Sequence, residues 1–278
     1  SKIGSGGSST KKTTRQPVGF GHREIAKILQ GGGYAHDRHR VFRDCIEMMA
    51  IALSNAVDLV HREAREARYL EIVRRYKRDE IEAFCRVLAV LTNTLDAGPA
   101  DVLGAAFGEL EVHNKDAGQF FTPFEVCRLM AGLMVGDGEA MRAKVASEGF
   151  VLASEPAVGA GAMVIALAEA MQNAGLNYQR HLHVTAVDVD ARAAHMAYIQ
   201  FSLLHIPAIV IVGNSITLET RETWYTPAHI LGAWSRKLEL RDAKDRARET
   251  PAATSPIQHE APLPAATATA QRQQLVLF

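Results

Sequence analysis

Two glycines and two acids in this chain stand at spacings that can bind a nucleotide. Gly159 and Gly161 follow an apolar run that ends at Glu155, and a helical pattern of small residues begins directly after them. Glycines in such a turn let the backbone come close to an adenosine-type cofactor. A plain strand-to-helix connection with glycines for packing explains the turn equally well. Asp188 favours the interpretation of the turn as a cofactor site. It ends the next apolar run, where a carboxylate can accept hydrogen bonds from ribose hydroxyls.

Alternating apolar runs and helical segments must position these residues. The runs at 151–155, 183–187 and 208–212 have the length and composition of buried strands, and helical patterns separate them. The third run ends in Gly213, Asn214 and Ser215. This alternation predicts an α/β fold with a parallel sheet and right-handed crossovers.

A helical region precedes the sheet. Apolar residues recur at three- and four-residue steps in 42–53 and 81–95, which predicts a helical subdomain over residues 36–97. The charged stretch between them could lie along DNA, but its interleaved acids favour a solvated face. Residues 1–35 are rich in Gly, Ser, Thr and Lys and are expected to form a flexible arm, in which only 23–30 could form a brief helix. The break at 96–99 starts the next domain, residues 98–240.

A polar-aromatic loop, GQFFTP at 118–123, lies between the helical region and the sheet. Thr122 can cap a helix that has Pro123 at its first position. The aromatic side chains of Phe120 and Phe121 could instead pack against an adenosine or methionine group, and the local pattern leaves both uses open.

Four motifs in a fixed order resemble a known family. They are GQFFTP at 118–123, EPAVGAGAMVIALA at 155–168, AVDVD at 186–190 and GNSI at 213–216. Over residues 37–220 the chain resembles the adenine-N6 DNA methyltransferases, and among them the modification subunit of type I restriction-modification systems. The resemblance implies a class I methyltransferase (Rossmann-like) sheet, the cofactor S-adenosyl-L-methionine and a DNA substrate. It assigns Phe120, Thr122 and Pro123 to the cofactor pocket, Glu155, Ala157, Gly159 and Gly161 to the loop under the methionine part, Asp188 to the ribose, and Asn214 with Ser215 to the adenine edge.

The chain departs from that family in its second half. The family carries Asn-Pro-Pro followed by Tyr or Phe after its fourth strand, where the amide and the ring hold a flipped adenine. No such tetrapeptide occurs here, so no catalytic residue is assigned, and the sheet is expected to stop after about three strands. The cluster Trp224–Pro227 lacks the amide and is expected to pack or to cover the sheet edge.

Three functions from different classes follow from this departure. The chain is an active adenine methyltransferase, a non-catalytic protein that binds cofactor or DNA, or one half of a split methyltransferase completed by a second chain. A specificity subunit is a further expected partner, because the resemblance places target recognition on a separate chain.

The C-terminal residues suggest another partner. Residues 241–273 are rich in Ala, Thr, Pro and charge and are expected to be a disordered linker. After them, Gln274, Leu275, Leu277 and Phe278 match the QLxLF peptide by which bacterial replication and repair proteins dock on the sliding clamp. The alternative is a tail that folds back on the body as a short strand.

Composition sets the remaining expectations. Lys+Arg and Asp+Glu are both 31, which gives no overall bias toward nucleic acid. The three cysteines stand among apolar residues and are expected to be reduced core residues, and no apolar run is long enough to cross a membrane or to serve as a signal peptide. His36 and His39 lack partners at metal-ligand spacing, so no metal site is expected. Together these observations favour a cytoplasmic protein, and the resemblances to restriction-modification and clamp-binding proteins imply a bacterial one.

Overall fold

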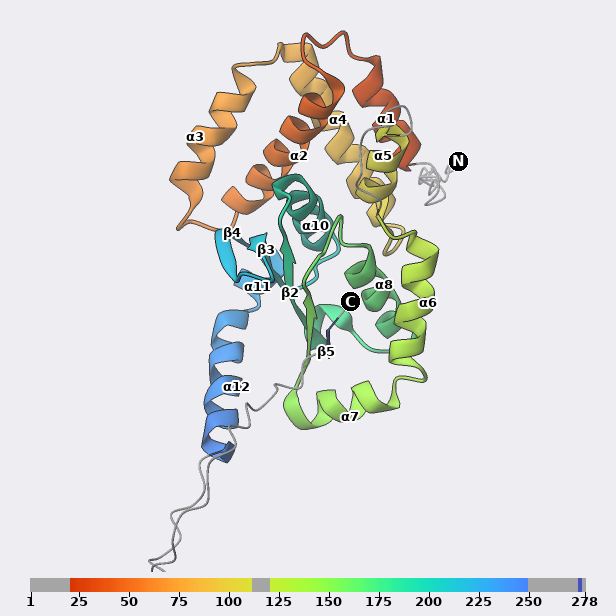
Figure 1. Ribbon diagram of the computed structural model, residues 1–278, viewed down its shortest axis with the longest axis vertical. Helices are drawn as coiled ribbons and strands as arrows, with labels where there is room; N and C mark the ends of the chain where they lie inside the picture. Colours follow the sequence, from red (N-terminus) through yellow and green to blue (C-terminus); the bar gives the residue numbers. More distant parts are fainter. Residues whose placement is uncertain (1–20, 112–120, 250–274, 277–278) are drawn as a thin grey trace, which may run out of the picture.

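The structure, a computed structural model, describes residues 21–111, 121–249 and 275–276 (Figure 1). Its N-terminal region is helical and comprises α1 (Gly21–Gly31), α2 (Arg38–Asn55), α3 (Arg62–Val73), α4 (Arg78–Leu95) and α5 (Val102–Glu111). Their apolar residues recur at helical spacing and face one another, and Ile25, Phe42 and Leu91 are buried where they meet. The region is therefore a helical bundle, as the periodicity predicts.

The bundle begins earlier than the sequence suggested. α1 packs against α4 and α5 and buries Ile25 and Leu29 in the core. The expectation of a flexible arm is thus wrong for Gly21–Gly31, where the brief helix allowed at 23–30 is longer and packed, because the segment GHREIAKILQG carries its apolar residues on one helical face. Residues 1–20 lie outside the described part. Cys45 and Cys127 are buried as expected, whereas Cys85 is exposed.

One sheet follows the bundle in the chain. β1 (Val151–Glu155), β2 (Leu182–Asp188) and β3 (Ala208–Asn214) pair in parallel, as predicted. β4 (Glu219–Tyr225) pairs antiparallel with β3, and β5 (Leu275–Val276) pairs in parallel with β1. Among the described residues the order is β4-β3-β2-β1-β5.

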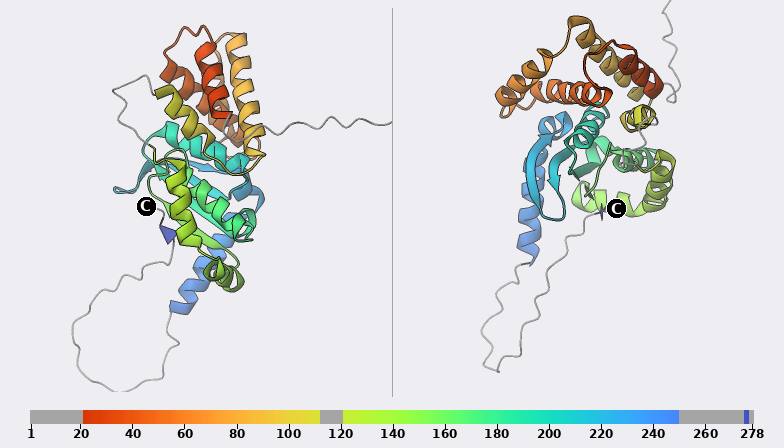
Figure 2. Two further views of the ribbon diagram at one scale, coloured as in Figure 1. Left: turned by 90° about the vertical axis from the view of Figure 1, so that its right-hand side faces the viewer. Right: turned by 45° about the horizontal axis from the view of Figure 1, so that its top comes forward.

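Helices connect the strands and cover the sheet. α6 (Phe124–Val135) and α7 (Glu139–Glu148) precede β1, α8 (Ala162–Asn173) and α9 (Tyr178–His181) follow it, and α10 (Ala191–Leu203) connects β2 to β3. Both parallel crossovers run in the same direction along the sheet, so right-handed connections put α8 and α10 on one face. The bundle packs on this face through contacts of α2, α4 and α5 with α10 (Figures 1 and 2).

Three elements after Asn214 differ from the expectation. β4 was missed because an outer strand half exposed to water carries charges in place of an apolar run, and its sequence is ETRETWY. α11 (Pro227–Leu231) and α12 (Trp234–Glu249) follow it. α12 continues to Glu249, so the expected linker of residues 241–273 is wrong for 241–249. In Figure 1 this helix projects from the body of the molecule.

Arg65 fastens the bundle to the sheet. Its guanidinium stacks on the Trp224 ring of β4, with 3.9 Å between the guanidinium carbon and the ring centroid, and it donates to the Thr223 carbonyl oxygen at 2.9 Å. It also donates to Asp58, at 2.7 Å, and that carboxylate is almost fully buried. Trp224 is buried against His195 and Tyr198. The Trp224–Pro227 cluster therefore packs and forms part of the sheet edge, as its sequence suggested.

No helix among the described residues is both long enough and apolar enough to span a bilayer.

Candidate functional site

The carboxyl ends of β1, β2 and β3 bring the candidate site residues to one edge of the sheet. Glu155 ends β1, Asp188 ends β2 and Asn214 ends β3. Glu155 pairs with Ala186, so Asp188 lies one two-residue step farther along the strand direction. In parallel sheets with helical crossovers, ligands bind outside this edge. The structure thus brings together three residues that are far apart in the sequence.

The glycine turn is held in a conformation that other residues rarely adopt. Gly159 has φ +56° and Gly161 has φ +101°. A Cβ atom at Gly159 would lie 2.9 Å from the Phe121 ring, and one at Gly161 would lie 2.7 Å from the Phe201 ring. The turn therefore needs glycine for its backbone angles and for the close approach of two aromatic rings. Val158 N donates to the Val187 carbonyl oxygen at 2.8 Å, which fixes the turn to the end of β2.

Asp188 links the glycine turn to the loop after β2 through hydrogen bonds. One carboxylate oxygen accepts from Gly159 N at 2.8 Å, and the other accepts from Asp190 N at 2.9 Å. Burial raises the pKa of Asp188 even though these two backbone donors favour the charged form. Each oxygen of a carboxylate has a second lone pair, so Asp188 can still accept hydrogen bonds from a ligand.

Glu155 is the second buried acid of the site. Its side chain is almost fully buried, and Oε1 accepts from Ala157 N at 3.1 Å. Burial, and to a smaller extent the neighbouring Asp188 charge, raise the pKa of Glu155 to about 7. Ala157 itself is exposed between these two acids and the glycines. The edge therefore holds two closely spaced acids whose charges are poorly solvated.

Asn214 and Ser215 begin the hairpin to β4. The Asn214 side-chain oxygen accepts from Ile216 N at 2.9 Å and from Thr217 N at 3.2 Å, which makes a local turn. Ile216 and Leu218 in this turn and Val189 after β2 expose most of their side chains. Arg221 of β4 donates to the Val189 carbonyl oxygen. The edge beyond β2 and β3 is thus apolar and exposed, next to one basic residue.

The loop before α6 contributes differently from the expectation. Phe120 lies outside the described residues, and Thr122 and Pro123 are exposed. Pro123 is the N-cap residue of α6 and no side chain bonds to the helix end, so the expected Thr122 cap is wrong. Phe121 is the residue that reaches the glycine turn, and it also packs on Phe107 of α5, with ring centroids 5.4 Å apart.

Gln200 of α10 is a site residue that the sequence reasoning missed. Its buried side-chain nitrogen donates to the Ala160 carbonyl oxygen at 2.8 Å and to Asp101 Oδ1 at 2.9 Å. Its side-chain oxygen accepts from Val102 N at 2.8 Å and Leu103 N at 3.1 Å. The side chain thus joins the glycine turn to the first turn of α5. The available signal was an amide in the otherwise apolar helical stretch AYIQFSLL.

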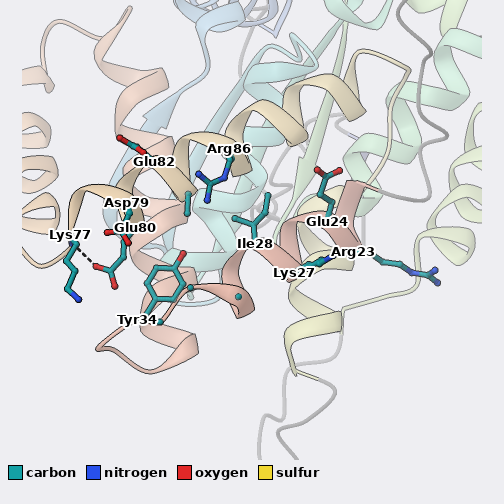
Figure 3. A pocket seen from close by; sticks show the side chains of 14 residues that line it. Arg23, Glu24, Lys27, Ile28, Tyr34, Lys77, Asp79, Glu80, Glu82 and Arg86 are labelled. Atoms are coloured by element: carbon teal, nitrogen blue, oxygen red, sulfur yellow. Dashed lines mark hydrogen bonds between the residues drawn. The ribbon is translucent and has the colours of Figure 1, made fainter.

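A cavity of about 1250 Å³ lies in the helical bundle, away from this edge. It lies between α1, residues 31–34 and the start of α4 (Figure 3). Its lining mixes both signs of charge, with Arg23, Lys27, Lys77 and Arg86 against Glu24, Asp79, Glu80 and Glu82. The Tyr34 ring lines it and stacks on Phe84. Such a mixed lining points to no single class of ligand.

The fold and the site define a class of protein. A helical N-terminal region, a mostly parallel sheet with helical crossovers and a glycine turn at the carboxyl edge form a truncated class I methyltransferase fold. Residues 101–238 match the family model described as N-6 DNA Methylase. This match covers just under half of the chain and is to the family that the motifs resemble.

The solved structures that are similar to the chain include the following two, and no curated protein matches it by sequence. One is a protein of Listeria monocytogenes described as a class I S-adenosylmethionine-dependent methyltransferase, with 12% identity and a TM-score of 0.36 over 68% of this chain and 51% of that one. The other is the methyltransferase subunit of a type I restriction-modification system of Streptococcus thermophilus, with 13% identity and a TM-score of 0.33 over 69% of this chain and 57% of that one. This chain therefore spans little more than half the length of either protein.

Proposed function

We propose that this chain is the cofactor-binding part of an S-adenosylmethionine-dependent adenine-N6 DNA methyltransferase, and that another polypeptide segment completes it. The observation that carries the proposal is the carboxyl edge, where Glu155, the glycine turn and Asp188 converge. The match of residues 101–238 to the N-6 DNA methylase family supports the same chemistry. DNA is then the substrate class, and the cytoplasm is where the chain would act.

The residues at this edge fit S-adenosylmethionine. The cofactor carries a sulfonium and an ammonium group, and both favour the poorly solvated carboxylates of Glu155 and Asp188. Its ribose hydroxyls can donate to the remaining lone pairs of Asp188, and the exposed apolar residues Val189 and Ile216 offer a surface for the adenine ring. When bound, the cofactor would supply the methyl group. The chain's own residues position it and accept its hydrogen bonds.

The split arrangement is supported by the position of β5. A strand parallel to β1 at this position has its carboxyl end at the same edge as Glu155 and Asp188. A base-binding motif that followed such a strand would therefore arrive next to the cofactor. The motif Asn-Pro-Pro-aromatic is absent from residues 1–278, so we propose that a polypeptide segment outside this sequence supplies it, which in the split arrangement is a second subunit.

Calorimetry with S-adenosylmethionine tests the cofactor assignment. We expect Asp188→Ala to weaken binding by at least about tenfold, because it removes an acceptor for the ribose and the carboxylate that holds Gly159. The exposed acid Asp242 on α12 provides a matched control, and Asp242→Ala should bind as the parent chain does. Equal affinities for both variants would overturn the assignment. Methyl transfer from radiolabelled cofactor to DNA by the isolated chain would instead contradict the split arrangement.

Docking on a bacterial sliding clamp is a second proposal, and it stands on the sequence pattern of the tail. Gln274, Leu277 and Phe278 lie outside the described residues, whereas Leu275 pairs with β1. Pairing with β1 and burial in a clamp pocket are mutually exclusive for Leu275. Deletion of residues 274–278 should abolish a clamp complex on a sizing column, and a complex that persists would overturn this proposal.

A further inference from the structure

The β1 strand lies near a sheet edge but has the residues of an interior strand. All five of its residues, Val151–Glu155, pair with β2. On its other side, among the residues that the structure describes, only Ala153 and Ser154 are paired, and their partners are the two residues of β5. Val151 and Ala153 are fully buried, and the sequence VLASE contains no lysine, arginine or proline. Edge strands usually carry such residues to prevent pairing with other chains.

The opposite edge of the same sheet shows the usual protection. β4 carries Glu219, Arg221 and Glu222, and the ladder that joins it to β3 is irregular between Val212 and Gly213. Charged residues and irregular pairing both discourage further strand addition. In the described part of the sheet, the β4 edge is therefore protected against the addition of a strand, and the β1 edge is not.

The present occupant of the β1 edge is small. Leu275–Val276 pairs in parallel, in the register Ala153 to Leu275 and Ser154 to Val276 (Figure 1). Two apolar residues in succession are typical of strands in parallel sheets, which are covered on both faces. A two-residue strand satisfies only part of the β1 backbone, whereas a five-residue strand could pair along its full length. A longer strand would therefore form more hydrogen bonds with β1 than the two-residue β5 does.

We propose that the β1 edge is a docking site for a parallel apolar strand from a second polypeptide, and that Leu275–Val276 occupies it until that strand arrives. The incoming strand is expected to be apolar at successive positions and at least as long as β1. For its biological role this inference rests on the proposed function, since a strand docked here ends beside Glu155. The tail, residues 274–278, then competes with the second polypeptide for the β1 edge.

A peptide in solution tests this docking. The probe is a fluorescent peptide of residues 271–278, QRQQLVLF, and the protein is the chain that lacks residues 274–278. By fluorescence anisotropy, the shortened chain should bind the peptide at least about tenfold more tightly than the full chain, whose own tail competes at a high effective concentration. A peptide with proline in place of both Leu275 and Val276 is the matched control and should not bind, because proline cannot donate to a strand.

Hydrogen exchange locates the interaction. Removal of the tail should speed amide exchange in residues 151–155, and the peptide should slow it again. Failure of the shortened chain to bind, equal binding by both chains, or binding without a change in these amides would each overturn the proposal. A full-length dimer that dissociates on removal of the tail would also overturn it, because the tail would then be exchanged between copies. Cofactor calorimetry on the same proteins is an independent measurement, so a failed cofactor assignment leaves the peptide result unaffected.

Discussion

Replacement of Gln200 by leucine should destabilise the chain more than its unchanged volume suggests. The side chain is fully buried and makes hydrogen bonds to the backbone of Ala160, Val102 and Leu103 and to the Asp101 carboxylate. Leucine leaves all four partners without this amide. A buried polar group without a partner costs about 1–3 kcal/mol, and partial rearrangement limits the sum, so we expect a loss of about 3–5 kcal/mol in the free energy of unfolding.

Urea denaturation measures this loss, and thermal unfolding gives an independent estimate. A domain of this size loses about 2–4 °C in Tm per kcal/mol, so the Gln200→Leu variant should unfold about 10 °C below the parent chain. The exposed Gln172 on α8 is the matched control, and Gln172→Leu should change the free energy by no more than about 0.5 kcal/mol. The glycine turn loses one of its anchors in the Gln200 variant, so its affinity for S-adenosylmethionine should also fall at temperatures where it remains folded.

A loss below about 1 kcal/mol for Gln200→Leu would refute this reasoning. It would mean that the four partners find other hydrogen bonds or water at little cost. An unchanged cofactor affinity together with a large loss of stability would show that Gln200 stabilises α5 without positioning the turn.

Three further predictions concern the bundle interface, pH and the turn. Arg65→Ala should lower the free energy of unfolding by about 3 kcal/mol in urea denaturation, because the buried Asp58 carboxylate loses its arginine partner and keeps only His61. Arg65→Lys should be intermediate, and equal stability of all three chains would contradict this. Burial lowers the folded-state pKa of His229 from 6.5 to about 4, so the unfolded chain binds the extra proton and stability should fall as pH drops from 6.5 toward 4. This loss is on the order of 3 kcal/mol, and His229→Gln should show a shallower dependence in denaturation at pH 7 and 4.5. Gly159→Ala should weaken cofactor binding in calorimetry because its Cβ meets Phe121, whereas Gly175→Ala, which has a similar φ and open space, should leave it unchanged.

The parallel core of the fold could be predicted from the sequence because burial on both faces leaves a clear pattern. Strands β1, β2 and β3 are apolar runs, and the helices between them repeat at helical spacing. β4 could not be predicted in the same way, since a half-exposed outer strand reads as a charged loop. α1 shows a related difficulty: the sequence indicated a brief helix at 23–30, but a short helix is stable only when its apolar face packs on a partner, and that partner was not evident from the sequence.

The glycine turn and the acids of the site were predictable, and the residues that hold them in place were not. Asp188 was assigned to a ligand, and its position supports this, but it also accepts from the Gly159 amide. That second role depends on the three-dimensional fold of the turn, and the spacing of residues in the sequence does not reveal this fold. Phe121 and Gln200 act across distances in sequence that no local pattern covers, and their partners became visible only when α5, α6 and α10 were placed together.

The raised pKa values at the carboxyl edge are consistent with the proposed ligand of positive charge, which would favour the ionised acids. Burial disfavours the charged form of Glu155, the nearby Asp188 charge adds to this effect, and the pKa of Glu155 is about 7 as a result. Structural acids are usually paired with basic residues, as Asp58 is with Arg65 in the bundle. Glu155 and Asp188 accept from backbone amides instead, which provide dipoles but no full charge. A bound cation would supply the missing charge, and two neighbouring acids with raised pKa values mark the carboxyl edge as a candidate functional site.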